Sequence, residues 1–161
     1  MNNVLFQDLT PQLATFLTAM TPVGELRAAI PLALTVHGMG VLESYVWSVV
    51  GNMVPVIFLL AALEKVSSFL IQKSPRARAF FNWLFERTRR KFKGHYEAWG
   101  ELTLILFVAV PLPMTGAWTG SIAAYLFGIP SKRAFLLILA GVMISGIIVT
   151  ILTAGASGLF F

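Results

Sequence analysis

"TPVGELRAAIPL" (residues 21–32) places two charges of opposite sign and two prolines in an otherwise apolar part of the chain. Glu25 and Arg27 stand two residues apart, between Pro22 and Pro31. Proline lacks the backbone N–H that continues a helix, and a charged side chain at the centre of a membrane helix costs about 2.5 to 3.5 kcal/mol. In a membrane protein, this stretch predicts a broken helix with a polar site at the break.

The composition of the whole chain is that of an integral membrane protein. Of its 161 residues, 57% are hydrophobic and 12% are charged, whereas an ordinary soluble domain has about 25% charged residues. Segments 41–63 and 134–155 are each long and apolar enough to cross a hydrocarbon core of about 30 Å. Within these spans, Gly51, Gly141 and Gly146 are expected to allow close approach of neighbouring helices.

The sequence offers little for metal or redox chemistry. It has no cysteine and only two histidines, His37 and His95, so neither a disulfide nor a thiolate metal site can form. No Ser–His–acid set or carboxylate pair converges on the broken stretches. We therefore expect no metal, no cofactor and no enzyme activity.

Segment 64–100, between the two spans, carries nine of the twelve Lys and Arg residues, which predicts that it lies in the cytoplasm. Aromatic side chains interleave with the basic ones, as is typical of amphipathic helices on a membrane surface. Anionic lipid headgroups are therefore the expected partners of residues 73–93. Nucleic acid is not expected, because the segment has no nucleic-acid-binding motif and membrane spans flank it. The residues concerned are Phe80, Phe81, Trp83, Phe85, Phe92, Tyr96 and Trp99, and the basic run Arg87, Arg89, Arg90, Lys91 and Lys93.

The apolar stretch 101–128 is interrupted too early to be a span. Its first arm, 102–110, has nine residues, which as a helix reach about 14 Å, or half-way across the core. "PLPMTGAWTG" (111–120) follows, and residues 116–127 are long enough to return the chain to its starting side. Lys132 and Arg133 then stay cytoplasmic, in agreement with the positive-inside rule. The stretch predicts a re-entrant helical hairpin.

Stretch 9–36 has the same organisation, with an arm at 11–20, a break at "TPVGE" and a return arm at 26–36. Because one span separates the two hairpins, they are expected to enter from opposite faces, as in the inverted repeats of many transporters. Gly38 with Gly128, and Gly51 with Gly141, match at one offset. The predicted fold is an all-α integral membrane protein, with residues 1–161 as a single membrane domain. The predicted hairpin breaks are Pro22, Gly24, Pro31, Pro111, Pro113, Gly116 and Gly120.

The break at residues 21–25 is the main candidate site. Non-helical backbone at membrane depth must be surrounded by protein or water, so we expect the two hairpin tips to face each other across a midplane cavity. Glu25 is a candidate carrier of a proton or ion, or a counter-charge for a cation. Arg27 is permanently charged and has paired donors that suit a phosphate or carboxylate headgroup. The alternative is that both charges only stabilise the tip.

The second tip offers polar groups without a full charge. Thr115, Trp118 and Thr119 can bind a headgroup, or they can satisfy carbonyls that the broken helix leaves unpaired. Asn52, in the first span, either points into the same cavity or makes a hydrogen bond between packed helices.

"GELRAAIP" (24–31) and "PLPMTGAWTG" (111–120) resemble the two signature stretches of the bacterial and archaeal small multi-drug export proteins. That family is similar to the wider DedA superfamily, and the likeness covers nearly the whole chain. It implies two opposed re-entrant hairpins and ion-coupled movement of phosphate-bearing lipids. Pro22, Gly24 and Glu25 loosely match the superfamily's Pro-Gly-Glu type of motif. The second half departs from it, because many DedA proteins carry arginines beside a proline where this chain has residues 115–118, "TGAW".

These observations favour a multi-pass transporter of a bacterial or archaeal cytoplasmic membrane, with both termini external. In the leading hypothesis, Arg27 holds an anionic headgroup while Glu25 exchanges a proton or ion during alternating access. A second hypothesis makes Glu25 the counter-charge of lipophilic cationic drugs. A third is a non-transporting membrane organiser that acts through its basic segment. A homodimer is expected, because two spans and two hairpins form only a thin wall around a cavity.

Overall fold

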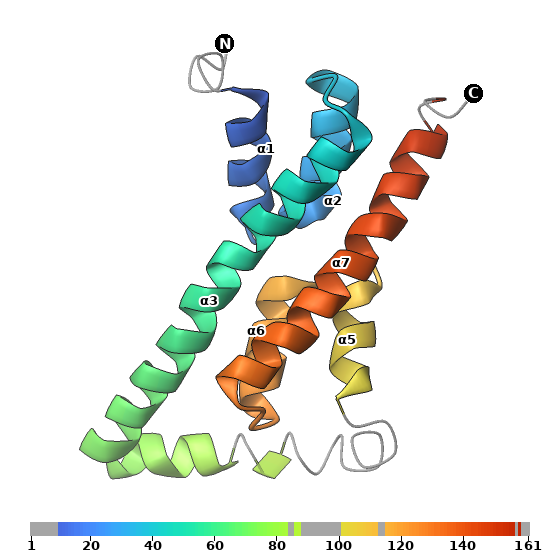
Figure 1. Cartoon of the computed structure of the whole chain (residues 1–161). Helices are drawn as coiled ribbons and strands as arrows, with labels where there is room; N and C mark the ends of the chain where they lie inside the picture. Colours follow the sequence, from blue (N-terminus) through green and yellow to red (C-terminus); the bar gives the residue numbers. More distant parts are fainter. Residues whose placement is uncertain (1–9, 84–85, 88–100, 113–114, 157, 159–161) are drawn as a thin grey trace. The chain divides into compact units, whose positions relative to one another are not determined.

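The computed structural model describes residues 10–83, 86–87, 101–112, 115–156 and 158 (Figure 1). Within these residues the chain is helical and contains no strand, which confirms the predicted all-α class. The elements are α1 (Pro11–Met20), α2 (Glu25–Pro31), η2 (Leu32–Val36), α3 (Val41–Lys73), α5 (Leu102–Ala109), α6 (Ala117–Leu126) and α7 (Ser131–Ala156). Residues 75–83 are also helical.

Two helices, α3 and α7, are long and apolar enough to cross a membrane, as the composition predicted. Helix α3 begins at Val41 as expected, but it continues ten residues past Leu63 to Lys73. The extension "EKVSSFLIQK" contains neither proline nor glycine, so nothing in it ends the helix. Its 33 residues are about 50 Å long, so the helix exceeds the thickness of the hydrocarbon core.

The helices form two compact units, which we describe separately. The first unit comprises Met1–Pro55 and Val142–Phe161, and the second comprises Val56–Gly141. Each unit therefore contains one pair of short helices, one half of α3 and one half of α7.

In the first unit, α1 and α2 form a helical hairpin. Helix α1 begins after Thr10, whose side chain accepts a hydrogen bond from the Leu13 N–H, and Pro11 occupies the first helical position, where its missing N–H costs nothing. Thr21 closes the turn between the helices: its hydroxyl donates to the Thr18 carbonyl at 2.8 Å and accepts from the Gly24 N–H at 3.0 Å. The chain then reverses into α2, which packs on α1.

The hairpin lies along the first half of α3. Gln12 at the start of α1 donates to the Glu43 carboxylate at 2.7 Å, and the rings of Phe16 and Trp47 meet edge to face. Further along, a Cβ at Gly51 would lie 2.5 Å from the Phe16 carbonyl oxygen, so only glycine permits this approach. Helices α1 and α3 therefore run side by side in the same direction, and the hairpin turn follows the contact at Gly51.

The second half of α7 packs on another side of α3 in this unit. A Cβ at Gly146 would lie 2.7 Å from the Tyr45 ring and 3.5 Å from Val49. The Tyr45 hydroxyl donates to the Met143 carbonyl at 3.1 Å. The expectation that Gly51 and Gly146 permit close helix packing is confirmed.

In the second unit, α5 and α6 form another short helical pair, and α5 packs on the first half of α7. A Cβ at Gly141 would lie 2.7 Å from Val108 and 2.9 Å from the Ile105 carbonyl oxygen. An ion pair joins Arg133 of α7 to Glu101, at 2.9 Å, just before α5 begins. Helix α5 is thus held to α7 by close packing at Gly141 and by an ion pair just before its first residue.

Candidate functional site

The turn of the first hairpin, residues 21–25, places a buried carboxylate at the start of α2. Glu25 is only 6% exposed, and its backbone N–H donates to the Thr21 carbonyl at 3.1 Å. Its φ of 44° lies in the left-handed region, and among the described residues no other non-glycine has a positive φ. Such a conformation costs about 1 to 3 kcal/mol and persists only where the surrounding structure holds it in place.

Arg27 is half-buried on the first turn of the same helix. Because residues two apart point to different sides of a helix, Glu25 and Arg27 do not share a face of α2. Pro22 and Gly24 lie in the turn, where they were expected. A Cβ at Gly24 would come within 2.6 Å of the Thr21 hydroxyl oxygen, so the closed turn requires glycine here.

Pro31 does not break the hairpin, contrary to the prediction. It has helical φ and ψ and ends α2, and the chain continues directly into the π-helix η2. Since the proline ring removes one N–H from the ladder, the helix widens: the His37 N–H reaches the Leu32 carbonyl five residues back, at 3.1 Å. The return arm is one helical run from Glu25 to Val36.

Asn52 lies in the same unit as Glu25 and at the level of the hairpin turn. Its neighbour Gly51 meets Ala19, close to the end of α1, as well as Phe16. Asn52 is 1% exposed, and its side-chain oxygen has no hydrogen-bond partner among the described residues. A buried, unpaired amide oxygen is costly, so Asn52 remains a candidate for contact with water, an ion or a substrate.

The second tip, between α5 and α6, uses its polar groups on its own backbone. The Thr115 hydroxyl lies 2.8 Å from the carbonyls of both Val110 and Leu112, and it accepts from the Leu112 N–H at 3.2 Å. Thr119 lies 3.4 Å from the Gly116 carbonyl. These bonds match the alternative in which the threonines satisfy carbonyls that the broken helix leaves unpaired.

The other predicted residues of this tip have separate roles. Pro111 follows the end of α5, and Gly116, with φ of 152°, precedes α6. Gly120 lies inside α6 and not at the break, contrary to the prediction. It allows α6 to approach α5 closely, because a Cβ there would lie 2.6 Å from Val108. Trp118 is half-buried on the first turn of α6. Pro113 lies outside the described residues. The two tips belong to different units, so their meeting across a common cavity stays a prediction.

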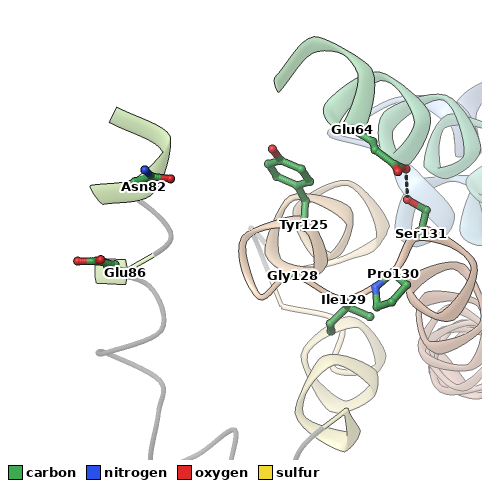
Figure 2. A pocket seen from close by; sticks show the side chains of 8 residues that line it. All are labelled: Glu64, Asn82, Glu86, Tyr125, Gly128, Ile129, Pro130 and Ser131. Carbon is green, nitrogen blue, oxygen red and sulfur yellow. Dashed lines mark hydrogen bonds between the residues drawn. The ribbon is translucent and has the colours of Figure 1, made fainter. Parts of the chain in front are cut away.

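A cavity of about 430 Å³ in the second unit was not anticipated from the sequence (Figure 2). Carboxylates of Glu64 and Glu86 and the phenol of Tyr125 give it an acidic, partly aromatic wall. Glu64 accepts a hydrogen bond from the Ser131 hydroxyl at 2.8 Å. The full lining is Glu64, Asn82, Glu86, Tyr125, Gly128, Ile129, Pro130 and Ser131. Such a wall suits a cation or an amine.

The sequence analysis did not predict this cavity, because it interpreted segment 64–100 from its basic and aromatic residues and gave its acidic residues no role. The available signal is that two acidic residues, Glu64 and Glu86, lie within a mostly basic segment. The turn that completes the wall depends on Gly128, whose φ of 70° a residue with a side chain rarely adopts.

The described part of the basic segment carries exposed aromatic side chains beside cations. Phe80 and Trp83 are 55% and 51% exposed, and Lys73 and Arg87 lie over the rings of Phe69 and Trp83. The basic run from residue 89 to 93, and Phe85, Phe92, His95, Tyr96 and Trp99, lie outside the described residues. Binding of anionic lipid by this segment stays a prediction.

The chain matches a known protein family. A family described as "Putative small multi-drug export protein" matches residues 25–148, more than half of the chain. The match begins at Glu25 and includes Arg27, Asn52 and the second tip. Curated proteins and solved structures give no match.

Proposed function

The chain belongs to the small multi-drug export protein family, and from that premise we propose that it exports small amphiphilic molecules across the membrane through the first hairpin. In this proposal, Glu25 exchanges a proton or ion, and Arg27 holds an anionic headgroup. The family match and the two membrane-length helices support a membrane transporter. The roles of the two charged residues rest on the geometry of the hairpin.

The observation that carries the proposal is the buried, left-handed Glu25. A carboxylate that only capped its own helix could sit in a relaxed, solvated position, where a negative charge near the helix N-terminus is already favourable. Glu25 instead is 6% exposed and holds φ at 44°. Burial and strain in one residue are the signs of a site that is maintained for function.

The depth of Glu25 suits this role. The Gln12–Glu43 hydrogen bond marks the exposed end of the hairpin. Asn52, at the level of the turn, lies nine residues further along α3 than Glu43, which is about 14 Å. The turn would thus lie near the middle of a core of about 30 Å, as in a re-entrant hairpin.

Equivalent features in the two halves support an internal repeat. Helices α3 and α7 begin at Val41 and Ser131, and each follows a glycine with positive φ, Gly38 or Gly128. The two helix starts and the two glycines are each 90 residues apart in the sequence, and so are Gly51 and Gly141. At Gly51 and at Gly141, a backbone carbonyl from the first arm of the hairpin contacts the long helix. We therefore propose that the halves form an inverted repeat of hairpin and span, as in many transporters.

The substrate class follows from Arg27. A guanidinium keeps its charge at any physiological pH and binds phosphate or carboxylate through two parallel hydrogen bonds. The resemblance to the DedA superfamily suggests lipid phosphates, and we propose an amphiphile with a phosphate headgroup as the first substrate to test.

A second candidate is the export of lipophilic cations. The description of the family names drugs, and the acidic cavity lined by Glu64, Glu86 and Tyr125 suits an organic cation better than a phosphate. In this case Glu25 would be the counter-charge within the membrane.

Transport in proteoliposomes under a proton gradient tests both candidates. The probes are a short-chain fluorescent lipid phosphate and the cationic dye ethidium. We expect Glu25→Gln to lower the flux of the true substrate at least tenfold, whereas the control Glu43→Gln, an exposed residue of the same unit, leaves it within twofold.

Arg27→Ala should lower lipid phosphate flux, and Glu64→Gln with Glu86→Gln should lower ethidium flux. Unaltered flux of both probes in Glu25→Gln and Arg27→Ala would refute the site.

A further inference from the structure

The cavity of the second unit is formed by three parts of the chain. Glu64 belongs to α3, and Asn82 and Glu86 belong to the segment that follows α3. The end of α6 and the start of α7 contribute Tyr125 and residues 128–131. The volume of about 430 Å³ falls within the range of about 300 to 1,000 Å³ that is usual for small-molecule sites. The cavity is therefore large enough for an organic ligand.

The charge of the cavity wall is opposite to that of its surroundings. Its charged residues are Glu64 and Glu86, although segment 64–100 contains nine of the twelve Lys and Arg residues. Neither carboxylate forms an ion pair with another described residue. The Arg87 guanidinium, next in sequence to Glu86, lies instead over the Trp83 ring, 5.1 Å from its centre. The two negative charges of the wall thus favour a cationic ligand.

The two carboxylates lie on different walls of the cavity. In Figure 2, Glu64 is on one side and Glu86 on the other, with Tyr125 between them. A Ca²⁺ or Mg²⁺ ion requires about six oxygen ligands around one point, whereas no three acidic or histidine side chains converge among the described residues. The arrangement favours a ligand with two separated positive charges over a single metal ion.

The wall between the carboxylates suits a hydrocarbon chain. The half-buried ring of Tyr125 and the exposed ring of Pro130 offer apolar surface, and an aromatic face also attracts an ammonium group. Linear aliphatic polyamines combine these features, because short methylene chains separate their amines. Alkyl amines have a pKa of about 10, as lysine does, so they are charged at neutral pH.

The position of the cavity indicates a ligand that comes from water. Glu64 directly follows the apolar segment 41–63, and Ser131 precedes the apolar segment 134–155. Both residues therefore lie where α3 and α7 leave the hydrocarbon core. A lipid headgroup with a single amine would engage only one of the two carboxylates, whereas a polyamine can engage both.

We propose that this cavity binds a linear aliphatic polyamine, with one ammonium group at Glu64, another at Glu86, and the methylene chain along Tyr125. The inference deepens the second candidate function, because it names the class of cation that the cavity selects. The use of the site in export rests on that candidate, whereas binding is testable without any transport.

Calorimetric titration of the purified full-length protein, in a non-ionic detergent and about 0.15 M salt, tests the site with spermidine as the probe. We expect spermidine to bind at least tenfold more tightly than the monoamine n-butylamine. Glu64→Gln and Glu86→Gln should each weaken spermidine binding at least fivefold, because each leaves one ammonium group without a carboxylate. Glu43→Gln, which changes the net charge equally but lies in the first unit, should leave the affinity within twofold. Equal affinities for the two amines, or an unaltered spermidine affinity in both variants, would overturn the proposal.

Protection of a thiol provides a second measurement that leaves both carboxylates in place. The natural chain has no cysteine, so Asn82→Cys introduces a single thiol in the cavity wall, and Gln72→Cys introduces one at an exposed position outside it. Spermidine should slow the reaction of a maleimide at residue 82 at least threefold and leave residue 72 unaffected. An unaltered rate at residue 82 would also overturn the site. Failure of the proposed function looks different: spermidine would bind and protect as expected, while Glu64→Gln with Glu86→Gln left ethidium flux intact.

Discussion

At the scale of single residues, Gly51 and Glu25 show which features a sequence can and cannot disclose. A glycine in a span indicates close helix packing, and the structure supplies the partner, the Phe16 carbonyl at 2.5 Å from a would-be Cβ. The sequence also marked Glu25, because a charge in an apolar stretch is conspicuous. Its left-handed φ of 44° was not predictable, since it depends on how the Thr21 turn closes.

Gly51→Ala should therefore destabilise the first unit, because its new methyl group meets backbone that cannot rotate away. Overpacking of this kind costs about 1 to 3 kcal/mol, so we expect a lower Tm in detergent, measured by circular dichroism. The control is Gly155→Ala, also in a membrane-length helix, where a Cβ meets nothing within 4 Å. Equal Tm values for the two variants would show that α1 does not press on α3 at Gly51.

At the scale of elements, the sequence predicted the helices better than the way they end. The predicted arm 11–20 matches α1, and the predicted arm 102–110 ends one residue after α5. Both ends were predictable, because each apolar stretch is short and a proline follows it. Pro31 was expected to break its helix, but proline also fits a helix that widens to a π-turn. The end of α3 at Lys73 was not predicted, because hydropathy indicates which residues are apolar enough for the membrane, whereas a helix can continue beyond them.

The hairpin turn makes an element-scale prediction. Thr21→Val removes both the bond to the Thr18 carbonyl and the one from the Gly24 N–H, and each such loss costs about 1 kcal/mol. We expect the first hairpin to lose about 2 kcal/mol, measured by steric trapping in bicelles. Thr35→Val, which removes a single bond to the Pro31 carbonyl on an exposed turn, should cost less than about 1 kcal/mol. A reversed order of the two variants would contradict the turn geometry.

At the scale of the whole molecule, counting residues against membrane thickness was enough to separate spans from short arms. An arm of eight to ten residues, such as α5 or α1, is too short to cross, whereas α3 and α7 are long enough. Residue counting could not predict the acidic cavity, because residues 64, 86, 125 and 131 of its wall are far apart in the sequence and come together through the fold, including the turn at Gly128. Sites made from several elements depend on tertiary structure, whereas Glu25 and Arg27, which share one short helix, were accessible from the sequence.

The membrane topology is the whole-molecule prediction on which the repeat depends. If residues 101–128 form a re-entrant hairpin, the chain enters and leaves the membrane there on one side, so Gln72 and Lys132 must lie on that side together. Cysteines at these exposed positions should both react with an impermeant maleimide in inverted membrane vesicles and stay unreactive in intact cells. Gly40→Cys, before the start of α3 and in open space, should show the reverse pattern, because α3 separates it from residue 72. If residues 72 and 132 were labelled from opposite sides, residues 101–128 would cross the membrane, and the hairpin, the repeat and the buried second tip would all be excluded together.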